Sequence, residues 1–192
     1  MKNIISFLIG LIIVNALSAQ TAEVPAIGDG TSGNPYQIAN LNNLYWLSQN
    51  SGEWNKYYIQ TTSIDASDTE NWNGGEGFDP IGNSTIHFTG EYNGNFNTIE
   101  GFYINRPDAE KQAMFGMING AVIQNLQLEN VSITARRHLG ALVGFGGWSA
   151  LVQNCSSSGS VNTTYDWAGG LIGYASNGFV VSRCSSSCNV SG

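Results

Sequence analysis

An internal repeat in the second half of the chain constrains the fold more than any other feature. Short apolar segments centred on glycine recur 28 or 29 residues apart, at Gly116, Gly144 and Gly173. Strand-like segments follow them with the same period, at Ile123, Val152 and Val181. We align a fainter copy, around Ile99, with Ile123. A near-constant period of about 20 to 50 residues is typical of stacked units, each too small to bury its apolar face alone. The chain is therefore predicted to be a solenoid.

The pattern within one period indicates strands rather than helices. From Ile123 to Ile133 the apolar residues lie mostly two or three apart, with Gln, Asn, Glu and Ser between them. Strands alternate with period two, whereas a helical face needs apolar residues three and four apart. Gly, Ser, Asn and Thr, which favour corners, recur every few residues after residue 60. We therefore predict an all-β fold, a parallel β-helix whose coils stack about 4.8 Å apart.

Several segments resemble the GLUG-motif repeat proteins, bacterial secreted and surface proteins named for a Gly-Leu-apolar-Gly turn. The repeats carry GALVGFG from Gly140 and GGLIGYA from Gly169, and FTGEYNGNFNTIEGFYI precedes them from Phe88. The segment GDGTSGNPYQIANLNNLYWLSQN, from Gly28, is similar to the one that precedes the first coil in many members. The resemblance implies a right-handed parallel β-helix outside the cell, and it implies no reaction.

Residues 1–19 have the pattern of a signal peptide. Lys2 precedes an apolar run from Ile4 to Val14, and the small residues from Ala16 to Ala19 suit cleavage. The apolar run is shorter than the roughly 20 residues that a membrane-spanning helix needs. We expect export to a secreted or cell-surface location, and no membrane insertion once the leader is removed.

Residues 20–82 are predicted to form an N-terminal cap and a first, irregular coil. Leu41, Leu44 and Leu47 recur at helical spacing after Asn40, a suitable N-cap, which predicts a short helix over residues 40–49. We expect the first strand at residues 57–59. A helix laid across the open end of a β-helix would cover unpaired strand edges and exposed core.

Residues 83–192 carry the GLUG-like repeats. The last copy stops in mid-coil at Gly192, whereas the preceding copy continues to the next Gly-apolar segment. We therefore expect the array to be truncated at its C-terminus, with Val181, Cys184 and Val190 on an exposed end face. Unpaired strand edges template further pairing, so self-association through this end is expected.

The charge of the chain narrows its partners. The formal net charge is −7, and only 11% of the residues are charged. An acidic surface argues against nucleic acid and anionic membranes as partners.

Acidic residues gather in the polar segment of residues 64–82, at Asp65, Asp68, Glu70, Glu76 and Asp79. The D-x-[DN]-x-[DN]-G pattern of a calcium loop is absent, so we interpret the segment as a solvated loop and expect no metal and no cofactor. Glycosidic cleavage needs paired carboxylates, and the repeat alignment places none in register. Cys155 and His138 lack a third, orienting group. We expect no catalytic residues and no enzyme activity.

Polar and sulfur side chains also follow the period. Cys155 and Cys184 are 29 residues apart, as are Asn125 and Asn154. The cysteines should face inward, either as a reduced stack or as a disulfide, with Cys188 left over. The asparagines should form a ladder of stacked amides along the solenoid axis. With Gly116, Gly144 and Gly173, these four residues are predicted to be structural repeat positions.

Three aromatic residues, Trp148, Tyr165 and Trp167, fall at predicted corners of the coils. Exposed rings on a rigid scaffold bind sugars or protein grooves, although rings also cover neighbouring strands. We therefore predict a secreted or cell-surface β-helical scaffold, an adhesin-like module whose loops contact an extracellular protein or glycan without catalysis. The alternatives are a carbohydrate-active β-helix enzyme, of the lyase or hydrolase class, and a non-catalytic glycan-binding module.

Overall fold

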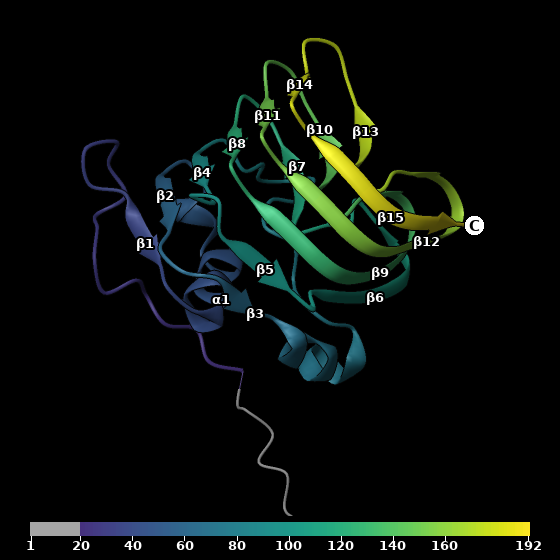
Figure 1. The fold of residues 1–192 in the computed structure, drawn as a ribbon, viewed down its shortest axis with the longest axis horizontal. Helices are drawn as coiled ribbons and strands as arrows, with labels where there is room; N and C mark the ends of the chain where they lie inside the picture. Colours follow the sequence, from purple (N-terminus) through teal and green to yellow (C-terminus); the bar gives the residue numbers. More distant parts are fainter. Residues whose placement is uncertain (1–19) are drawn as a thin grey trace, which may run out of the picture.

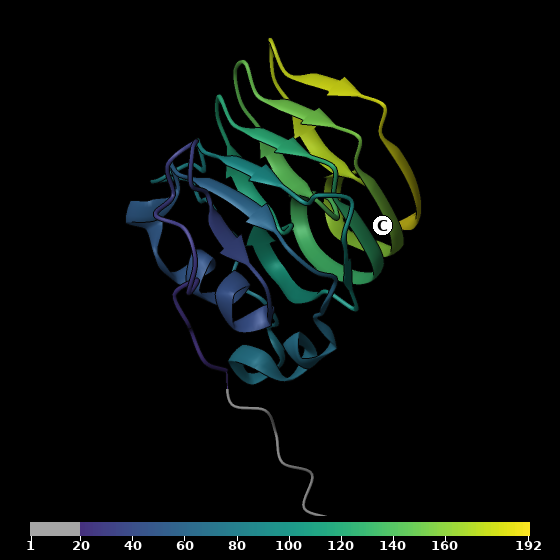
Figure 2. The same cartoon turned by 60° about the vertical axis from the view of Figure 1, so that its left-hand side comes forward.

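The computed structural model describes residues 20–192, which form a parallel β-solenoid with short helices near its N-terminus (Figure 1). The predicted parallel β-helix is confirmed. Figure 2 shows the coils as successive layers, from the first in purple to the last in yellow. The predicted signal peptide, residues 1–19, lies outside the described residues. None of the helices after residue 19 has the length and apolarity needed to span a bilayer.

Three parallel sheets run along the solenoid. The first has the strand order β1 (Tyr36–Ile38), β2 (Tyr57–Gln60), β4 (Glu91–Asn93), β8 (Val122–Gln124), β11 (Leu151–Gln153) and β14 (Val180–Ser182). The second runs from β3 (Ile64–Asp65) through β5 (Thr98–Glu100), β9 (Gln127–Leu139) and β12 (Ser156–Ala168) to β15 (Ser185–Ser191), with β6 (Tyr103–Glu110) beside β9. The third comprises β7 (Phe115–Ile118), β10 (Val143–Gly146) and β13 (Ile172–Ala175). Each full coil therefore contributes one strand to each sheet.

The register of the later coils follows the repeat. Val152 stands between Ile123 and Val181 in the first sheet, as predicted. The alignment of Ile99 with Ile123 is wrong, because Ile99 pairs with Leu128 and Tyr92 stands beside Ile123. The corner between β4 and β5 holds two more residues than the corner between β8 and β9. The alternation of apolar residues in the sequence fits both alignments, so it did not reveal the difference.

The glycine repeat lies in strands of the third sheet rather than in turns. Gly116, Gly144 and Gly173 occupy equivalent places in β7, β10 and β13. A Cβ atom on Gly144 would stand 2.8 Å from the carbonyl oxygen of Gly116, and one on Gly173 would stand 2.5 Å from the amide nitrogen of Leu139. Both distances are too short for a carbon atom, so the backbone there leaves room for glycine alone.

The predicted N-terminal helix is confirmed as α1 (Leu41–Gln49), and the Asn43 amide donates to the Asn40 side chain at 2.9 Å. The helix follows β1, in the place where strands of the second and third sheets follow in later coils. Leu44 and Leu47 are fully buried, so α1 covers the core at this end. The first strand is β1, ahead of the helix, and not residues 57–59, which belong to β2. A short 3₁₀ turn, Ser51–Glu53, links α1 to β2.

The polar segment of residues 64–82 is not the solvated loop that we expected. It begins with β3 and continues through 3₁₀ turns over Ser67–Gly75. Trp72, Phe78 and Ile81 are buried in the core. These three apolar side chains attach the segment to the side of the stack. The many polar residues around them hid this in the sequence.

Candidate functional site

The outer side of the third sheet carries a row of aromatic rings in consecutive coils. Phe145 stands in register with Met117 and with Tyr174, and the Phe145 and Tyr174 rings stack with centroids 4.8 Å apart. At one end of the row, Trp167 stacks on His138 at 4.6 Å. We use the name aromatic face for Phe145, Trp148, Tyr165, Trp167 and Tyr174.

Of the predicted aromatic residues, Trp148 and Trp167 adjoin the ring row, and Tyr165 lies two residues before Trp167 in β12. Trp148 is 66% exposed, at the corner after β10, and lines a small cavity of about 180 Å³ with Met117 and Phe145. Tyr165 is 67% exposed, and Trp167 is 49% exposed, both in the second half of β12. Trp167 packs against Tyr174 as well as His138. Its ring therefore contributes to packing, and the rest of it is exposed to solvent.

Sequence reasoning missed Phe145 and Tyr174. Each directly follows a glycine of the repeat, Gly144 or Gly173, so the period itself was the available signal. Phe145 is half-buried and Tyr174 is 38% exposed, so both rings reach the surface of the third sheet. An aromatic residue at this position in consecutive coils builds a ladder on the outer side of the sheet.

Three cations lie against the aromatic face. Lys111 is 5.8 Å from the Phe145 ring centroid, Arg137 is 5.8 Å from that of Trp167, and Arg136 is 5.5 Å from that of Tyr165. Cations over ring faces are attracted by the ring quadrupole. The chain as a whole is acidic, so this concentration of positive charge distinguishes the face from the rest of the surface.

His138 lies beneath Trp167 and is 8% exposed. Burial lowers the pKa of its imidazole below the ordinary value, and the nearby Arg137 lowers it further. The Nδ1 atom is buried and has no hydrogen-bond partner in the described part of the chain. His138 therefore favours the neutral form that packs among the rings.

Glu110 holds two of the cations in place. Its Oε1 atom accepts from Arg136 Nη1 at 3.3 Å and lies 2.7 Å from Arg137 Nε, with which it forms an ion pair. The Arg137 guanidinium beside it holds the pKa of the Glu110 carboxyl below its usual range. The carboxylate thus positions both guanidinium groups beside the aromatic face.

The asparagine positions form an amide ladder. Asn154 Nδ2 donates to Asn125 Oδ1 at 2.9 Å, and Asn125 Nδ2 donates to Asn93 Oδ1 at 3.0 Å. Asn125 and Asn154 also have positive φ, 55° and 52°, which asparagine tolerates better than most residues. A second ladder runs beside it, from Gln153 to Gln124 at 2.7 Å and on to Glu91 at 2.8 Å.

All three cysteines are free in the structure. Cys155 is buried below Cys184, in the stack that begins with Leu126, and Cys188 is half-buried. Burial raises the pKa of the Cys155 thiol to about 12. The thiol therefore stays protonated at neutral pH, which does not suit a nucleophile.

Carboxylates do stand in register, contrary to our alignment. Asp65 pairs with Glu100, and Glu100 pairs with Glu129, on three neighbouring strands of the second sheet. Asp65 and Glu100 line a groove of about 520 Å³. The misplaced Ile99 alignment hid this row, because Glu100 moves with Ile99. Within residues 20–192, no three His, Cys, Asp or Glu side chains come together as a metal site.

The chain is similar to short parts of much longer proteins. No family model matches it. It is 37% identical over 139 residues to halomucin of Haloquadratum walsbyi, a match that covers 70% of this chain and 2% of halomucin. It is 34% identical over 137 residues to a proposed Gly-rich membrane protein of Evansella cellulosilytica, covering 69% of this chain and 16% of that protein.

The fold also occurs in a crystal structure of a proposed immunoglobulin A1 protease from Bacteroides ovatus. The TM-score is 0.58, with 19% identity, over 84% of this chain and 50% of the other. This likeness shows the fold alone. The chain is thus a β-solenoid similar to short segments of large proteins, one of them named as a membrane protein.

Proposed function

We propose that this chain is a rigid, non-catalytic module of a secreted or cell-surface protein, of the GLUG-like kind, that binds a glycan through its aromatic face. The observation that carries the proposal is the exposed ring of Trp148 together with the ring row of Phe145 and Tyr174. Tryptophan and tyrosine give large contact areas at a low cost in side-chain entropy. Their attachment to stacked coils holds them in place before a ligand arrives.

The match to a proposed membrane protein and the predicted signal peptide both support a location at the cell surface. The coil stack supports an adhesin-like role. Each coil adds about 4.8 Å of stiff rod, so the aromatic face is held at a fixed place along the molecule.

A glycan array tests this proposal. Residues 20–192 should bind a defined subset of glycans, and the double variant Trp148→Ala, Trp167→Ala should lose at least about tenfold in apparent affinity. The matched control is Phe96→Ala, because Phe96 is as exposed as Trp148 but lies at a corner between β4 and β5. Equal binding by the double variant and the wild type would refute the assignment of the aromatic face.

A second candidate, a carbohydrate-cleaving enzyme, is favoured by the in-register row of Asp65, Glu100 and Glu129 beside its groove. Neighbouring strands bring carboxyl groups to separations of the order needed for glycosidic cleavage, about 5 to 9 Å. Two features weigh against it. All three residues are exposed, and hydrogen bonds from Ser67 hold the pKa of Asp65 below its usual range, whereas a general acid needs a raised pKa.

Release of reducing ends from a polysaccharide panel distinguishes the two candidates. The glycan-binding proposal expects no activity above that of a Glu100→Gln variant. Activity that this substitution abolishes would establish the enzyme instead.

A further inference from the structure

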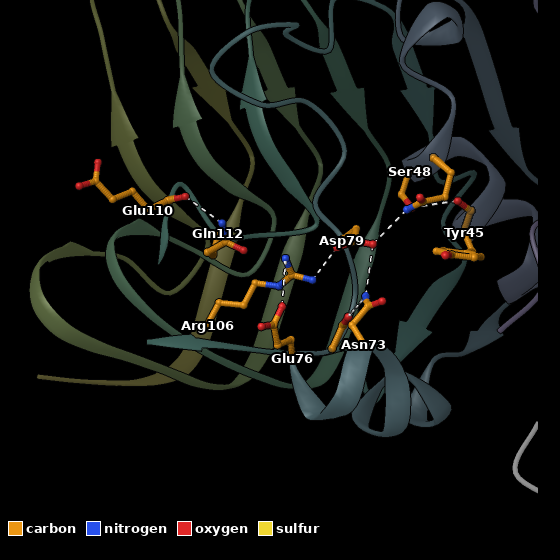
Figure 3. Close-up of polar contacts among 10 residues, drawn as sticks. Tyr45, Ser48, Asn73, Glu76, Asp79, Arg106, Glu110 and Gln112 are labelled. Carbon is orange, nitrogen blue, oxygen red and sulfur yellow. Dashed lines mark hydrogen bonds and ion pairs between the residues drawn. The ribbon is translucent and has the colours of Figure 1, made fainter. Parts of the chain in front are cut away.

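A cleft separate from the outer row of rings lies between α1, the segment of residues 79–84 and the end of β6 (Figure 3). We call it the polar cleft. Its volume is about 320 Å³, within the range of sites for small molecules. The lining residues that matter here are Gln49, Asp79, Ser84, Arg106, Lys111 and Gln112.

A network of charged and amide groups fixes one wall of the polar cleft. Asp79 Oδ1 accepts from the Arg106 guanidinium, and Asp79 Oδ2 accepts from Gln49 at 3.1 Å and from Asn73 at 3.2 Å. Arg106 also lies 3.7 Å from Glu76. These residues come from three separate parts of the chain, as Figure 3 shows. The wall is therefore held in one arrangement before any ligand binds.

Gln112 contributes an acceptor without a donor. The side chain is 8% exposed, and its Nε2 atom donates to the Glu110 backbone carbonyl at 2.8 Å. The Oε1 atom is buried and has no hydrogen-bond partner among residues 20–192. In Figure 3 this oxygen points toward the Arg106 side of the cleft. A buried acceptor without a donor is costly and rare, so this one is a feature that a ligand hydroxyl would satisfy.

Lys111 contributes a cation without a counter-ion. Its ammonium group donates to Ser84 Oγ at 2.9 Å, and within residues 20–192 no carboxylate lies within ion-pair distance of it. The neighbouring carboxylates are occupied, since Asp79 pairs with Arg106 and Glu110 pairs with two arginines. The polar cleft is thus lined by one positive charge without a carboxylate partner and by one acceptor without a donor.

We propose that the polar cleft binds an acidic sugar unit, a hexuronate residue, with its carboxylate on Lys111 and a ring hydroxyl donating to Gln112 Oε1. Reaching this oxygen requires a rotation of the Gln112 side chain. Neutral sugars lack the anion, and inorganic anions such as sulfate lack the hydroxyl donor. A sugar acid carries both on one rigid ring.

This inference rests on the proposed function in taking a glycan as ligand, and it names the class of sugar. Lys111 connects the two surfaces, because it lines the polar cleft and also lies over the Phe145 ring. An acidic oligosaccharide could therefore place a uronate in the cleft and continue onto the aromatic face.

Calorimetric titration with D-galacturonate, and with D-galactose as the neutral counterpart, tests the site. Galacturonate should bind saturably and galactose should not. Lys111→Asn should weaken binding at least about tenfold, since it removes a charge-assisted hydrogen bond. Asparagine suits this position because Lys111 has a φ of 60°. The matched control is Lys56→Gln, which removes a cation that does not line the cleft.

Gln112→Leu separates binding from folding. It should lose galacturonate binding while the melting temperature changes little, because it removes an unsatisfied acceptor together with one hydrogen bond. Equal binding of galactose, undiminished binding by Lys111→Asn, or no binding of galacturonate would each overturn the proposal. The Trp148→Ala, Trp167→Ala variant keeps the cleft, so it should retain galacturonate binding even if binding on the array is lost.

Discussion

The two ends of the solenoid bury their coils very differently. At the N-terminal end, Leu44 and Leu47 of α1 are fully buried, and aromatic residues such as Tyr58 and Tyr92 fill the first coils. In the last coil, Val180 and Val181 are about half exposed, although Val181 continues the stack of the fully buried Val152. The strands β13, β14 and β15 each have one neighbour within the described residues.

This difference teaches that burial in a solenoid comes from the neighbouring coil and not from the residue. The same position, with the same side chain, is core in β11 and surface in β14. Self-association through the end face stays a prediction. The comparison itself can be tested with substitutions that act at one end and not at the other.

The largest difference is expected between Val152→Asp and Val181→Asp. A charge at Val152 would be buried without a partner and should lower the free energy of unfolding by at least about 4 kcal/mol. The same change at Val181 should cost less than about 1 kcal/mol, because the side chain is half exposed in the structure. Urea denaturation of both variants measures the difference. Similar costs at both positions would mean that the end face is covered in solution.

The capping helix should contribute nearly as much to the free energy of unfolding as a core strand does. Leu47→Ala removes a fully buried side chain and should cost about 2–5 kcal/mol. Asn42→Ala, on the half-buried side of the same helix, should cost less than about 1 kcal/mol. Thermal melts followed by circular dichroism give both values. A mild effect of Leu47→Ala would show that α1 packs loosely and does not close the stack.

The amide ladder should give a smaller effect. Asn154→Ala loses the hydrogen bond to Asn125 and places alanine at a φ of 52°, together about 2 kcal/mol. Asn154→Gly keeps the backbone unstrained, so it should cost about half as much. Chemical denaturation of the two variants separates the hydrogen bond from the strain. Equal costs would mean that the backbone conformation contributes nothing.

The smallest effect concerns His138 and pH. The unfolded chain binds a proton at this residue near pH 6.5, whereas burial moves the folded pKa lower. Stability from this group is therefore fully present above about pH 6.5 and decreases as the pH falls below it. Melting temperatures from about pH 8 to pH 5 should show this decline, and His138→Asn should flatten it. His87→Asn, the matched control, should leave the decline intact.

The period made the regular coils predictable. The register of Val152, the inward place of Cys155 and the ladder of Asn154 all follow from a constant spacing of 29 residues. Prediction failed where spacing changed: two additional residues between β4 and β5 misplaced Ile99 and so hid the pairing of Glu100 with Glu129. The helix was predictable because its cap and apolar face are local.

The candidate sites were predictable only in part. Trp148 and Trp167 are visible as aromatic residues near corners, whereas the ring row depends on the register of the third sheet. The polar cleft brings together residues up to 64 positions apart, Ser48 and Gln112, from elements of different kinds. No local pattern in the sequence predicts that these residues line one cleft. Only the three-dimensional fold reveals it.

The spacing of 29 residues between neighbouring amides of the ladders has a mechanical consequence. Interstrand hydrogen bonds in stacked coils lie along the solenoid axis, so tension applied along that axis loads them directly. Each coil depends on its neighbours alone, so the stack should yield one coil at a time. A released coil of this length would extend by on the order of 90 Å. Under tension, the molecule would then act as a stepwise extensible tether.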